Sequence, residues 1–340
     1  MKNLKNNIIE YIENEFEKNI ISNSLIENND KLVVAVSGGP DSMCLLDLLF
    51  RLKPLFENNY HIYYDLVVAH VNHMIRIESE DEKVYVQNFC EEREIPFYYL
   101  KENVPALSKK LKLSEETCGR KIRYDFFDQV LKDTNAQKIV TAHNANDDVE
   151  TIFLNLFRGC GLNGLTGMSV QYKNIIRPLI TVEKKDIMQY NIMKNLNPCI
   201  DVTNFQEINR RNKIRNSLIP QIEKEYNSNI INSILRMKEV LREDEDFLNR
   251  YTYSLVDECI LEYDHTIQFD FSKILKEHVS IKKRAIREII RRKCFNLDGI
   301  SNIHILDILD LLEHNIKGKK YIIGNKFTIE IIKKNIAIIF

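Results

Sequence analysis

A chain of 340 residues exceeds the length of one ordinary domain, so the sequence favours two domains. It is 44% hydrophobic and 29% charged, which is typical of a globular protein and excludes a low-complexity chain. The net charge of −1 excludes a uniformly basic surface, so any nucleic-acid-binding surface must be local. No apolar run approaches the ~18 residues of a membrane span, and the charged N-terminus is not a signal peptide. The seven cysteines are scattered singly without CxxC, which favours reduced thiols in the cytoplasm over a cysteine-held metal.

The first predicted elements are short apolar runs rich in β-branched and aromatic residues, at residues 31–37, 64–71, 96–100 and 138–142. Stretches with helical spacing lie between them, for example at 41–52 and 78–94. This alternation predicts βαβ units and a doubly wound, Rossmann-like parallel α/β sheet that is buried on both faces. Ligands of such sheets bind beyond the carboxyl ends of the strands. The segments SGGPDS, HVNH and HNANDDVE fall at those ends.

Glycine and proline usage changes near residue 220, where the last proline stands. Residues 221–248 form a polar amphipathic stretch without helix breakers, which predicts one long helix. We therefore expect a catalytic domain over 1–218, a connector helix over 219–248 and a second domain over 249–340.

The second domain is expected to be smaller and mainly helical. Its helices are predicted near 279–294 and 301–314, with short strands near 320–340. The chain stops at IAIIF, as if on a strand.

The segment SGGPDS, residues 37–42, follows the first predicted strand. Backbone N–H groups of a glycine-rich turn that opens a helix can converge on phosphate oxygens, helped by the helix dipole. The glycines permit close approach and the serines add hydroxyl donors, but Asp41 suits an anion site only if a divalent cation lies between. Pro40 stands where a Walker A loop would have its lysine. The alternative is a plain strand–helix turn in which Asp41 or Ser42 caps the helix.

The segment HNANDDVE follows the fourth predicted strand. On a helix that begins there, Asp147 and Glu150 share one face, His143 lies one turn earlier, and Asp148 points away. The carboxylate pair could hold an ammonium group or Mg²⁺. An acidic first turn that complements the helix dipole is the alternative, but it does not account for the glycine-rich RGCGLNGL that follows.

Histidines and arginines recur near the same strand ends. His70 and His73 bracket Asn72 and are interpreted as polar lining of a crevice. Arg120 and Arg123 lie three residues apart on a predicted helix, where ordinary surface cations are the alternative.

Two segments concentrate positive charge, RRNKIRN at 210–216 and IKKRAIREIIRRK at 281–293. A basic helix face is often only solvated. In a chain of net charge −1, two such segments also suggest contacts with a phosphate backbone.

Several of these segments resemble a known family. SGGPDS after a first strand resembles the PP-loop of the ATP pyrophosphatases, which cleave ATP between its α and β phosphates. HNANDDVETIFLNLFRGCGLNGLTGM resembles the corresponding block of tRNA(Ile)-lysidine synthetases, as do HVNHMIR, GRKIRYDFF, IIRPLI and DVTNFQEINRRNKIRNSLIP. Together these blocks cover most of residues 31–220 in the expected order.

The resemblance implies a cytoplasmic, tRNA-modifying ligase that uses ATP and Mg²⁺. ATP would adenylate the wobble cytidine of isoleucine tRNA with a CAU anticodon, releasing pyrophosphate, and free L-lysine would then displace AMP. No membrane association is expected, and a homodimer is left open. Many members of the family carry a further C-terminal domain, which we expect to be absent from this chain.

The resemblance also implies roles for individual residues. It implies ATP binding by Ser37, Gly38, Gly39, Pro40, Asp41, Ser42, His70 and His143. It implies catalytic roles for Asp41, Arg123, Asp147 and Glu150, with Asp41 also at the metal and Asp147 and Glu150 also at the lysine. Contacts with tRNA are expected from Arg120, Arg177, Arg211 and Arg215, which lie in these blocks, and from Arg284 and Arg291 of the second basic segment.

Three other functions compete with this interpretation. A PP-loop tRNA thiolase would deliver sulfur to an activated base, and the absence of CxxC counts against it. An amide-forming ligase of the GMP or NAD synthetase type would need an ammonia source, and no glutaminase-like segment is visible. A nucleotide-binding RNA-binding protein without turnover would not need Asp41, Asp147 and Glu150.

Overall fold

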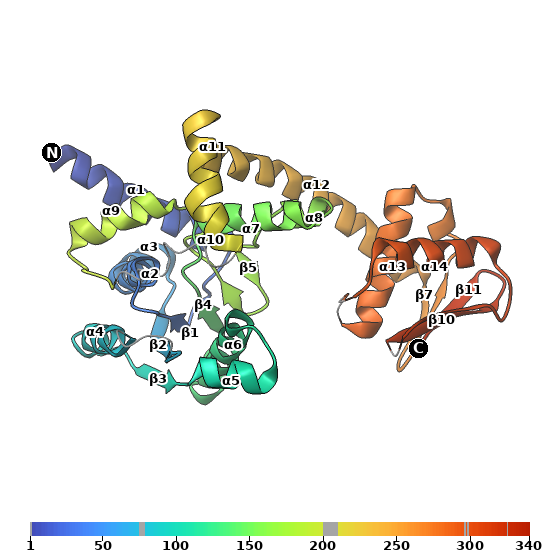
Figure 1. The fold of residues 1–340 in the computed structure, drawn as a ribbon, viewed down its shortest axis with the longest axis horizontal. Helices are drawn as coiled ribbons and strands as arrows, with labels where there is room; N and C mark the ends of the chain where they lie inside the picture. The colour runs from blue at the N-terminus through green and yellow to red at the C-terminus, as the bar shows by residue number, and fades with distance from the viewer. Residues whose placement is uncertain (1, 75–78, 200–209, 296, 298, 325) are drawn as a thin grey trace. The chain divides into compact units, whose positions relative to one another are not determined.

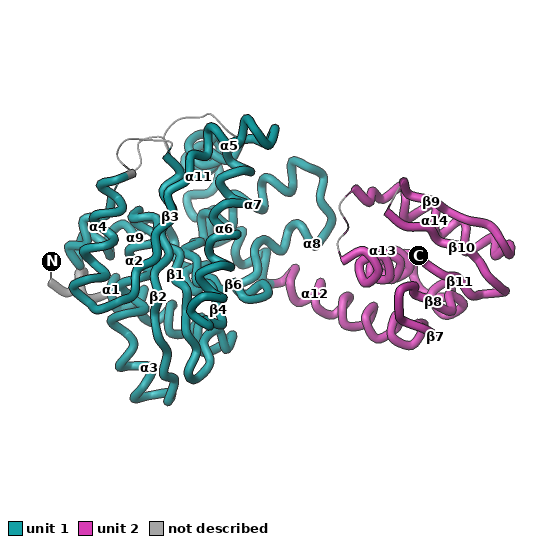
Figure 2. Tube along the Cα trace, turned by 90° about the horizontal axis from the view of Figure 1, so that it is seen from below, with its two compact units in different colours: residues 1–239 teal, residues 240–340 magenta. Residues whose placement is uncertain are grey.

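The structure is a computed structural model that describes residues 2–74, 79–199, 210–295, 297, 299–324 and 326–340. The chain divides into two compact units, residues 1–239 and 240–340 (Figure 2). The division falls inside one long helix, α12 (Ile230–Cys259). No helix in the described ranges combines the length and the apolar character needed to cross a membrane.

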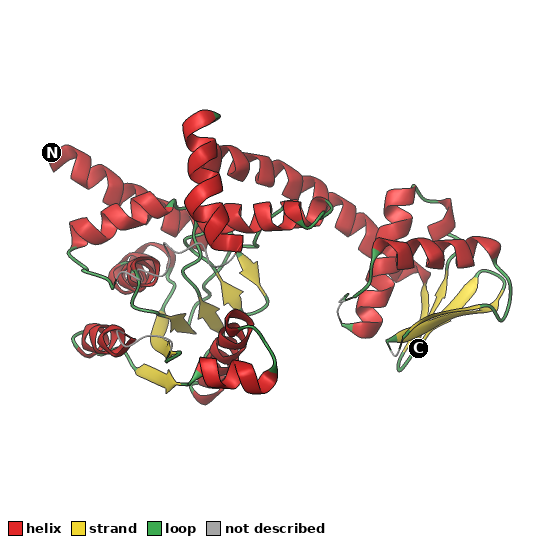
Figure 3. Ribbon diagram, in the orientation of Figure 1, coloured by secondary structure: helices red, strands yellow, loops and turns green. Residues whose placement is uncertain are grey.

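A six-stranded sheet forms the centre of the first unit, in the order β3-β2-β1-β4-β6-β5 (Figures 1 and 3). The strands are β1 (Asp30–Ala35), β2 (Tyr64–Asn72), β3 (Phe97–Lys101), β4 (Lys138–Val140), β5 (Gln171–Tyr172) and β6 (Ile175–Ile176). All neighbours pair in parallel except β5 with β6. The predicted doubly wound α/β sheet is therefore confirmed, with β5 and β6 added at one edge.

Both faces of this sheet are buried. Leu32 and Val34 of β1 belong to a large core that includes residues of α2 and α4, whereas Val33 faces a smaller core with Phe127 of α6. Alternating apolar residues that are buried on both sides explain why β1 reads as a continuous hydrophobic run. Helices therefore cover both faces and leave the strand ends as the place where a ligand can enter.

The first unit is completed by the helices α1 (Lys2–Ser22), α2 (Pro40–Arg51), α3 (Lys53–Tyr60), α4 (Ser79–Glu91), α5 (Val104–Leu111), α6 (Glu115–Asp133), α7 (Ala145–Phe157), α8 (Leu162–Leu165), α9 (Lys184–Lys194), α10 (Arg210–Lys213) and α11 (Ile219–Glu225), with a π-helical turn at Ile214–Leu218. The predicted helices at 41–52 and 78–94 correspond to α2 and α4. Helix α1 was not predicted, because its charges interrupt the apolar pattern. It packs through Ile12, Phe16 and Ile20, which recur every four residues and are fully buried.

The stretch expected to be one helix over 221–248 is two helices, α11 and α12, separated at residues 226–229. Asparagine side chains compete with the helix there, because Asn227 accepts from the backbone N–H of Asn229 at 2.9 Å. Helix α12 then continues to Cys259, since Val256 and Cys259 are buried in the core of the second unit. The expected domain limits at 218 and 248 stay a prediction.

The second unit combines helices with an antiparallel sheet (Figure 3). The strand order of this sheet is β7-β8-β11-β10-β9. Its elements are the end of α12, β7 (Ile260–Tyr263), β8 (Ile267–Asp270), a 3₁₀ turn (Ile274–Lys276), α13 (Val279–Cys294), α14 (Asn302–His314), β9 (Lys320–Ile323), β10 (Phe327–Lys333) and β11 (Ile336–Ile339). The predicted helices and C-terminal strands are confirmed. Strands β7 and β8 were missed, because LEYDHTIQFD is short and mostly polar.

Candidate functional site

The loop of residues 37–42 connects β1 to α2 at the centre of the first unit's sheet. Here the strand order reverses, because β1 pairs with β2 on one side and β4 on the other. Gly38 has φ +88°, a left-handed conformation, and a Cβ there would lie 3.3 Å from Cβ of Glu82. The loop thus lies at the topological switch point, where doubly wound sheets bind ligands.

Hydrogen bonds within the loop leave two helix N–H groups without an acceptor in the described ranges. The Ser42 hydroxyl donates to the Gly39 carbonyl at 2.9 Å and accepts from the Ser37 N–H at 3.2 Å. Helix α2 begins at Pro40, with Gly39 as an N-cap residue that supplies no side-chain bond. The N–H groups of Asp41 and Ser42 have no acceptor among the described residues. Such a helix N-terminus can bind an anion.

Helix α7 brings the second motif to the same place. Asn144 caps it in a capping box with Asp147, in which Asn144 Oδ1 accepts from the Asp147 N–H at 3.1 Å. The side-chain amide of Asn144 also donates to Asp41 Oδ1 at 2.9 Å. One asparagine thus joins two motifs that are about a hundred residues apart in the chain.

The carboxylate of Asp41 lies in a buried and highly charged environment. Burial raises its pKa above the ordinary value, and among the neighbouring charges Lys184 is the strongest influence that lowers it. The negative charge of Asp147 raises the pKa further, so the two carboxylates are electrostatic neighbours.

These carboxylates are suitable ligands for Mg²⁺. This ion typically binds one or two carboxylates together with substrate phosphates, and Asp41 with Asp147 beside the loop fits that donor set. The described ranges contain no cluster of three or more His, Cys, Asp or Glu residues that could hold a metal by themselves.

Asp147 and Glu150 share one face of α7, as predicted, but arginines already bind them. Arg211 donates to Glu150 Oε2 at 2.8 Å, and Arg215 donates to Glu150 Oε1 at 2.6 Å and to Asp147 Oδ1 at 3.0 Å. The Glu150 side chain is 1% exposed, whereas that of Asp147 is 19% exposed. The two arginines that were predicted to contact RNA are therefore turned toward the carboxylates in this structure.

Asp148 points away from this cluster, as predicted, and it is fully buried. It accepts from the Met168 N–H at 2.5 Å and forms an ion pair with Lys238 of α12. Gly167 has φ +64°, and a Cβ on it would lie 2.4 Å from Asp148 Oδ1. The glycine-rich segment after α7 is therefore needed to close the backbone over Asp148.

His143 lies on the approach to α7, and its Nδ1 is 2.9 Å from the Thr141 hydroxyl. Burial lowers the pKa of His143 to about 4, opposed by Asp147 and reinforced by the positive charges of Arg177 and two other arginines. His143 is thus neutral at pH 7 and can donate or accept one hydrogen bond without bringing charge.

At the end of β2, His70 Nδ1 lies 2.8 Å from the Val36 carbonyl, so Nδ1 carries the proton and donates. Its other ring nitrogen, Nε2, is buried without a partner. Arg123 of α6 donates from Nη2 to His73 Nε2 at 3.2 Å. His70 and Arg123 thus both reach the strand ends that flank the loop.

The remaining predicted RNA contacts differ in exposure. Arg120 is exposed, and its guanidinium lies 5.0 Å from the ring centre of Tyr124. Arg177 is only 7% exposed and donates to the Ser169 carbonyl at 2.8 Å. In the second unit, Arg284 pairs with Glu245 at 2.7 Å and Arg291 with Glu288 at 2.7 Å. Their roles in tRNA binding stay predictions.

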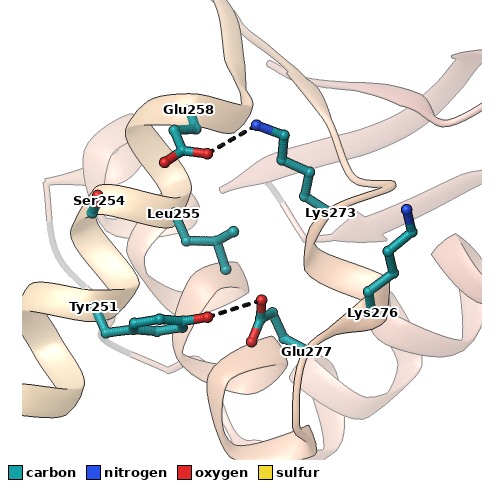
Figure 4. Close-up of a pocket in the computed structure, with 7 residues that line it drawn as sticks. All are labelled: Tyr251, Ser254, Leu255, Glu258, Lys273, Lys276 and Glu277. Carbon is teal, nitrogen blue, oxygen red and sulfur yellow. Dashed lines mark hydrogen bonds and ion pairs between the residues drawn. The ribbon is translucent and has the colours of Figure 1, made fainter.

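The second unit contains a pocket of about 290 Å³ beside α12 (Figure 4). It is lined by Tyr251, Ser254, Leu255, Glu258, Lys273, Lys276 and Glu277. Lys273 pairs with Glu258 at 2.8 Å, and the Tyr251 hydroxyl donates to Glu277 at 3.0 Å. The charges of this pocket are balanced, so it does not form a positive surface.

Comparison with known proteins assigns this chain to a family. Residues 7–222 match the family model described as a PP-loop domain. The chain belongs to the PP-loop family. The loop of residues 37–42 is therefore its PP-loop, and the resemblance read from the sequence is confirmed.

Curated relatives extend beyond the PP-loop domain. A tRNA(Ile)-lysidine synthase of Caldanaerobacter subterraneus subsp. tengcongensis is 39% identical over 91% of this chain and 65% of its own length. Those of Clostridioides difficile and Clostridium acetobutylicum are 38% and 40% identical, over 88% and 84% of this chain and 64% and 60% of their own lengths. The chain thus spans somewhat less than two thirds of the length of these relatives.

Among solved structures, the U34-tRNA thiolase NcsA from Methanococcus maripaludis, which carries a 4Fe–4S cluster, matches with a TM-score of 0.54. It is 20% identical and covers 69% of this chain and 80% of its own. At this identity the likeness concerns the fold alone.

Sequence reasoning missed several residues that build the site. Asn144 joins the PP-loop to α7, and its capping pattern with Asp147 could have been recognised. The pairing of Lys238 with Asp148 and that of Arg215 with Glu150 could not, because each partner lies far away along the chain.

Proposed function

We propose that the chain is a tRNA(Ile)-lysidine synthase. The observation that carries the proposal is the 39% identity to such an enzyme over 91% of this chain. It is supported by a site in which the PP-loop and the carboxylates of α7 meet through Asn144. The reaction joins free L-lysine to the wobble cytidine of isoleucine tRNA with a CAU anticodon.

In the first step, the cytosine C2 oxygen attacks the α-phosphorus of ATP. The bond from that phosphorus to the bridging oxygen breaks, and its electron pair leaves with pyrophosphate. In the second step, the ε-amine of lysine forms a bond to C2, the bond from C2 to oxygen breaks, and AMP leaves. The amine must lose a proton for the new carbon–nitrogen bond to persist as lysidine.

The PP-loop would bind the ATP phosphates. Its serines, its glycines, Pro40 and Asp41 form the wall of the phosphate site, and the free N–H groups at the start of α2 would donate to phosphate oxygens. Mg²⁺ held by Asp41, with Asp147 close by, would offset phosphate charge. His70 and His143 flank the loop, and we keep both in the nucleotide site.

Arg123 is assigned to the α-phosphate. Its guanidinium donates to His73 just after β2, which fixes the cation near the carboxyl end of that strand. A preorganised cation at this position stabilises the negative charge that develops on phosphate oxygens during transfer.

We assign different roles to Asp147 and Glu150 in binding the free lysine substrate. Because Glu150 is buried between Arg211 and Arg215, we assign it to hold these arginines and, through them, to shape the lysine site. Asp147 is more exposed and would orient the lysine ammonium group. An ordinary ammonium has a pKa of ~10.4 and an ordinary carboxyl group has a pKa of ~4, so orientation is a better role for Asp147 than proton removal.

Isoleucine tRNA would bring the cytidine in a single-stranded anticodon loop, where an unstacked base can enter a pocket. Arg120 is exposed near the strand ends and keeps its predicted tRNA contact, as do Arg177, Arg211, Arg215, Arg284 and Arg291. We further propose that the enzyme works in the cytoplasm, where tRNA is modified. A homodimer stays a prediction.

The deciding experiment supplies the protein with ATP, Mg²⁺, labelled L-lysine and an isoleucine tRNA transcript with a CAU anticodon. We expect lysine-dependent label in the RNA, with AMP and pyrophosphate released. A transcript with the anticodon changed to GAU is the matched control and should take up no label. Labelling that requires a sulfur donor, or none at all with a folded protein, would overturn the proposal.

A further inference from the structure

The PP-loop lacks a cation of its own. Its six residues, 37–42, include no lysine or arginine, and Pro40 stands where a Walker A loop has a lysine. Its side chains contribute hydroxyls and the negative charge of Asp41, whereas the triphosphate of ATP carries several negative charges. Backbone N–H groups alone give partial charges, so a cation from another element is needed close to the loop.

Lys184 is held beside both halves of the site. It begins α9, and its backbone N–H donates to Asn146 Oδ1 of α7 at 2.9 Å. Two turns later on the same helix, Asn191 donates from Nδ2 to the Pro40 carbonyl of the PP-loop at 3.0 Å. Helix α9 is thus fastened to the start of α7 and to the PP-loop itself.

The charge of Lys184 acts on the same region. Of the neighbouring cations, Lys184 lowers the pKa of the Asp41 carboxyl most, ahead of Arg215. Lys184 is only half-buried, and among the described residues it forms no ion pair with a carboxylate, whereas the next residue, Lys185, pairs with Glu183 at 2.8 Å. A lysine on a helix that is fastened to the PP-loop, with no carboxylate bound to it in the described ranges, is available to an incoming anion.

We propose that Lys184 binds the β and γ phosphates of ATP and the pyrophosphate that leaves. It supplies from α9 the cation that the PP-loop does not contain. When the bond from the α-phosphorus to the bridging oxygen breaks, the additional negative charge appears on pyrophosphate, and the Lys184 ammonium stabilises it. The inference rests on the ATP binding that the proposed function includes. It does not depend on free L-lysine or RNA being the other substrates.

Nucleotide affinity measured by calorimetry tests this role without the full reaction. The variants are Lys184→Met, Lys184→Gln and Lys184→Arg, and Lys185→Met is the matched control on the adjacent position of the same helix. The ligands are Mg²⁺–ATP, Mg²⁺–pyrophosphate and AMP. Thermal melting of each variant establishes that it is folded.

We expect Lys184→Met and Lys184→Gln to weaken ATP and pyrophosphate binding by about tenfold or more, because a charge-assisted contact is lost. AMP binding should stay unchanged, because AMP lacks the phosphates that Lys184 would contact. Lys184→Arg should recover most of the affinity, and Lys185→Met should resemble the unmodified protein.

Two results would overturn the inference. Equal losses for AMP and ATP would mean that Lys184 only supports the fold of the site, and unchanged affinity for all three ligands would mean that it contacts none of them. These results are separate from a failure of the proposed function. The Lys184 variants could lose affinity for ATP and pyrophosphate as expected while the unmodified protein transfers no free lysine to tRNA. That result would refute only the RNA-modifying activity.

Discussion

The PP-loop region of the first unit and helix α13 of the second are both rich in charge, but they use it differently. In α13, two cations are matched by partners from other elements: Arg284 by Glu245 of α12 at 2.7 Å and Lys282 by Glu313 of α14 at 3.3 Å. Around the PP-loop, helix N–H groups have no described acceptor, and Lys184 has no carboxylate partner in the described ranges. Charge that the fold already neutralises contributes to stability, and charge that it does not neutralise is available to a ligand.

The largest expected effect concerns charge that is fully neutralised inside the first unit. Lys238→Met would leave Asp148 buried without its cation, and removing one partner of a buried pair costs about 3–5 kcal/mol. We expect a loss of that order in the free energy of unfolding, measured by urea denaturation. Lys273→Met is the control and should cost far less, because the Lys273–Glu258 pair is exposed and Glu258 is 58% exposed. Similar losses of unfolding free energy in Lys238→Met and Lys273→Met would contradict the distinction between buried and exposed ion pairs.

The second effect concerns charge left available at the PP-loop. Asp41→Asn should lower ATP-dependent pyrophosphate release by at least about a hundredfold, since it removes the carboxylate assigned to Mg²⁺. Its melting temperature should change little, because the amide can still contact Asn144. Asp186→Asn, on the neighbouring helix α9, is the control. A variant that keeps its activity would remove Asp41 from the metal site.

The sequence predicted the elements that carry local signals. The buried run of β1, the turn SGGPDS and the acidic face of α7 are visible in a few consecutive residues, and all were placed correctly. The ion-pair partners of the charged side chains could not be predicted from such local signals. Arg215 reads as a surface cation beside Arg211, yet it pairs with Glu150, which is 65 residues away. Whether a cation is already paired depends on carboxylates that are distant in the sequence. Hydrophobic periodicity does not show where those carboxylates lie in the fold.

The third prediction tests whether α13 binds RNA despite its internal pairs. Arg284→Ala should lower the free energy of unfolding by about 1–3 kcal/mol, because the buried Glu245 loses the guanidinium of Arg284. Lys283, for which the described ranges show no ion pair, should instead contribute to tRNA affinity.

The salt dependence of tRNA binding separates the two roles. Lys283→Met should reduce the slope of log affinity against log salt by about 1, as expected for one lost phosphate contact. The RNA contact predicted for Arg284 requires the same reduction in Arg284→Ala. An unchanged slope in both variants would assign α13 to the fold alone.

The smallest effect is a pH dependence that the PP-loop region should show and α13 should not. The pKa of His143 is lowered to about 4 by burial and by the positive charges of Arg177, Arg211 and Arg120, against the opposing charge of Asp147. An unfolded chain has an ordinary histidine pKa near ~6.5. Between these two values the unfolded chain binds more protons than the folded one, so stability should rise with pH from about 4 to 6.5 and then level off.

His143→Asn should therefore flatten the rise in the free energy of unfolding between pH 5 and pH 7.5, measured by urea denaturation. The raised pKa of Asp41 acts in the opposite direction, so the informative quantity is the difference between the variant and the unmodified protein at each pH. His278→Asn, at the exposed N-cap of α13, is the control and should keep the rise. If His143→Asn kept the full rise, the neutral histidine would lie elsewhere, with His73 as the next candidate, because burial and Arg123 also lower its pKa to about 4.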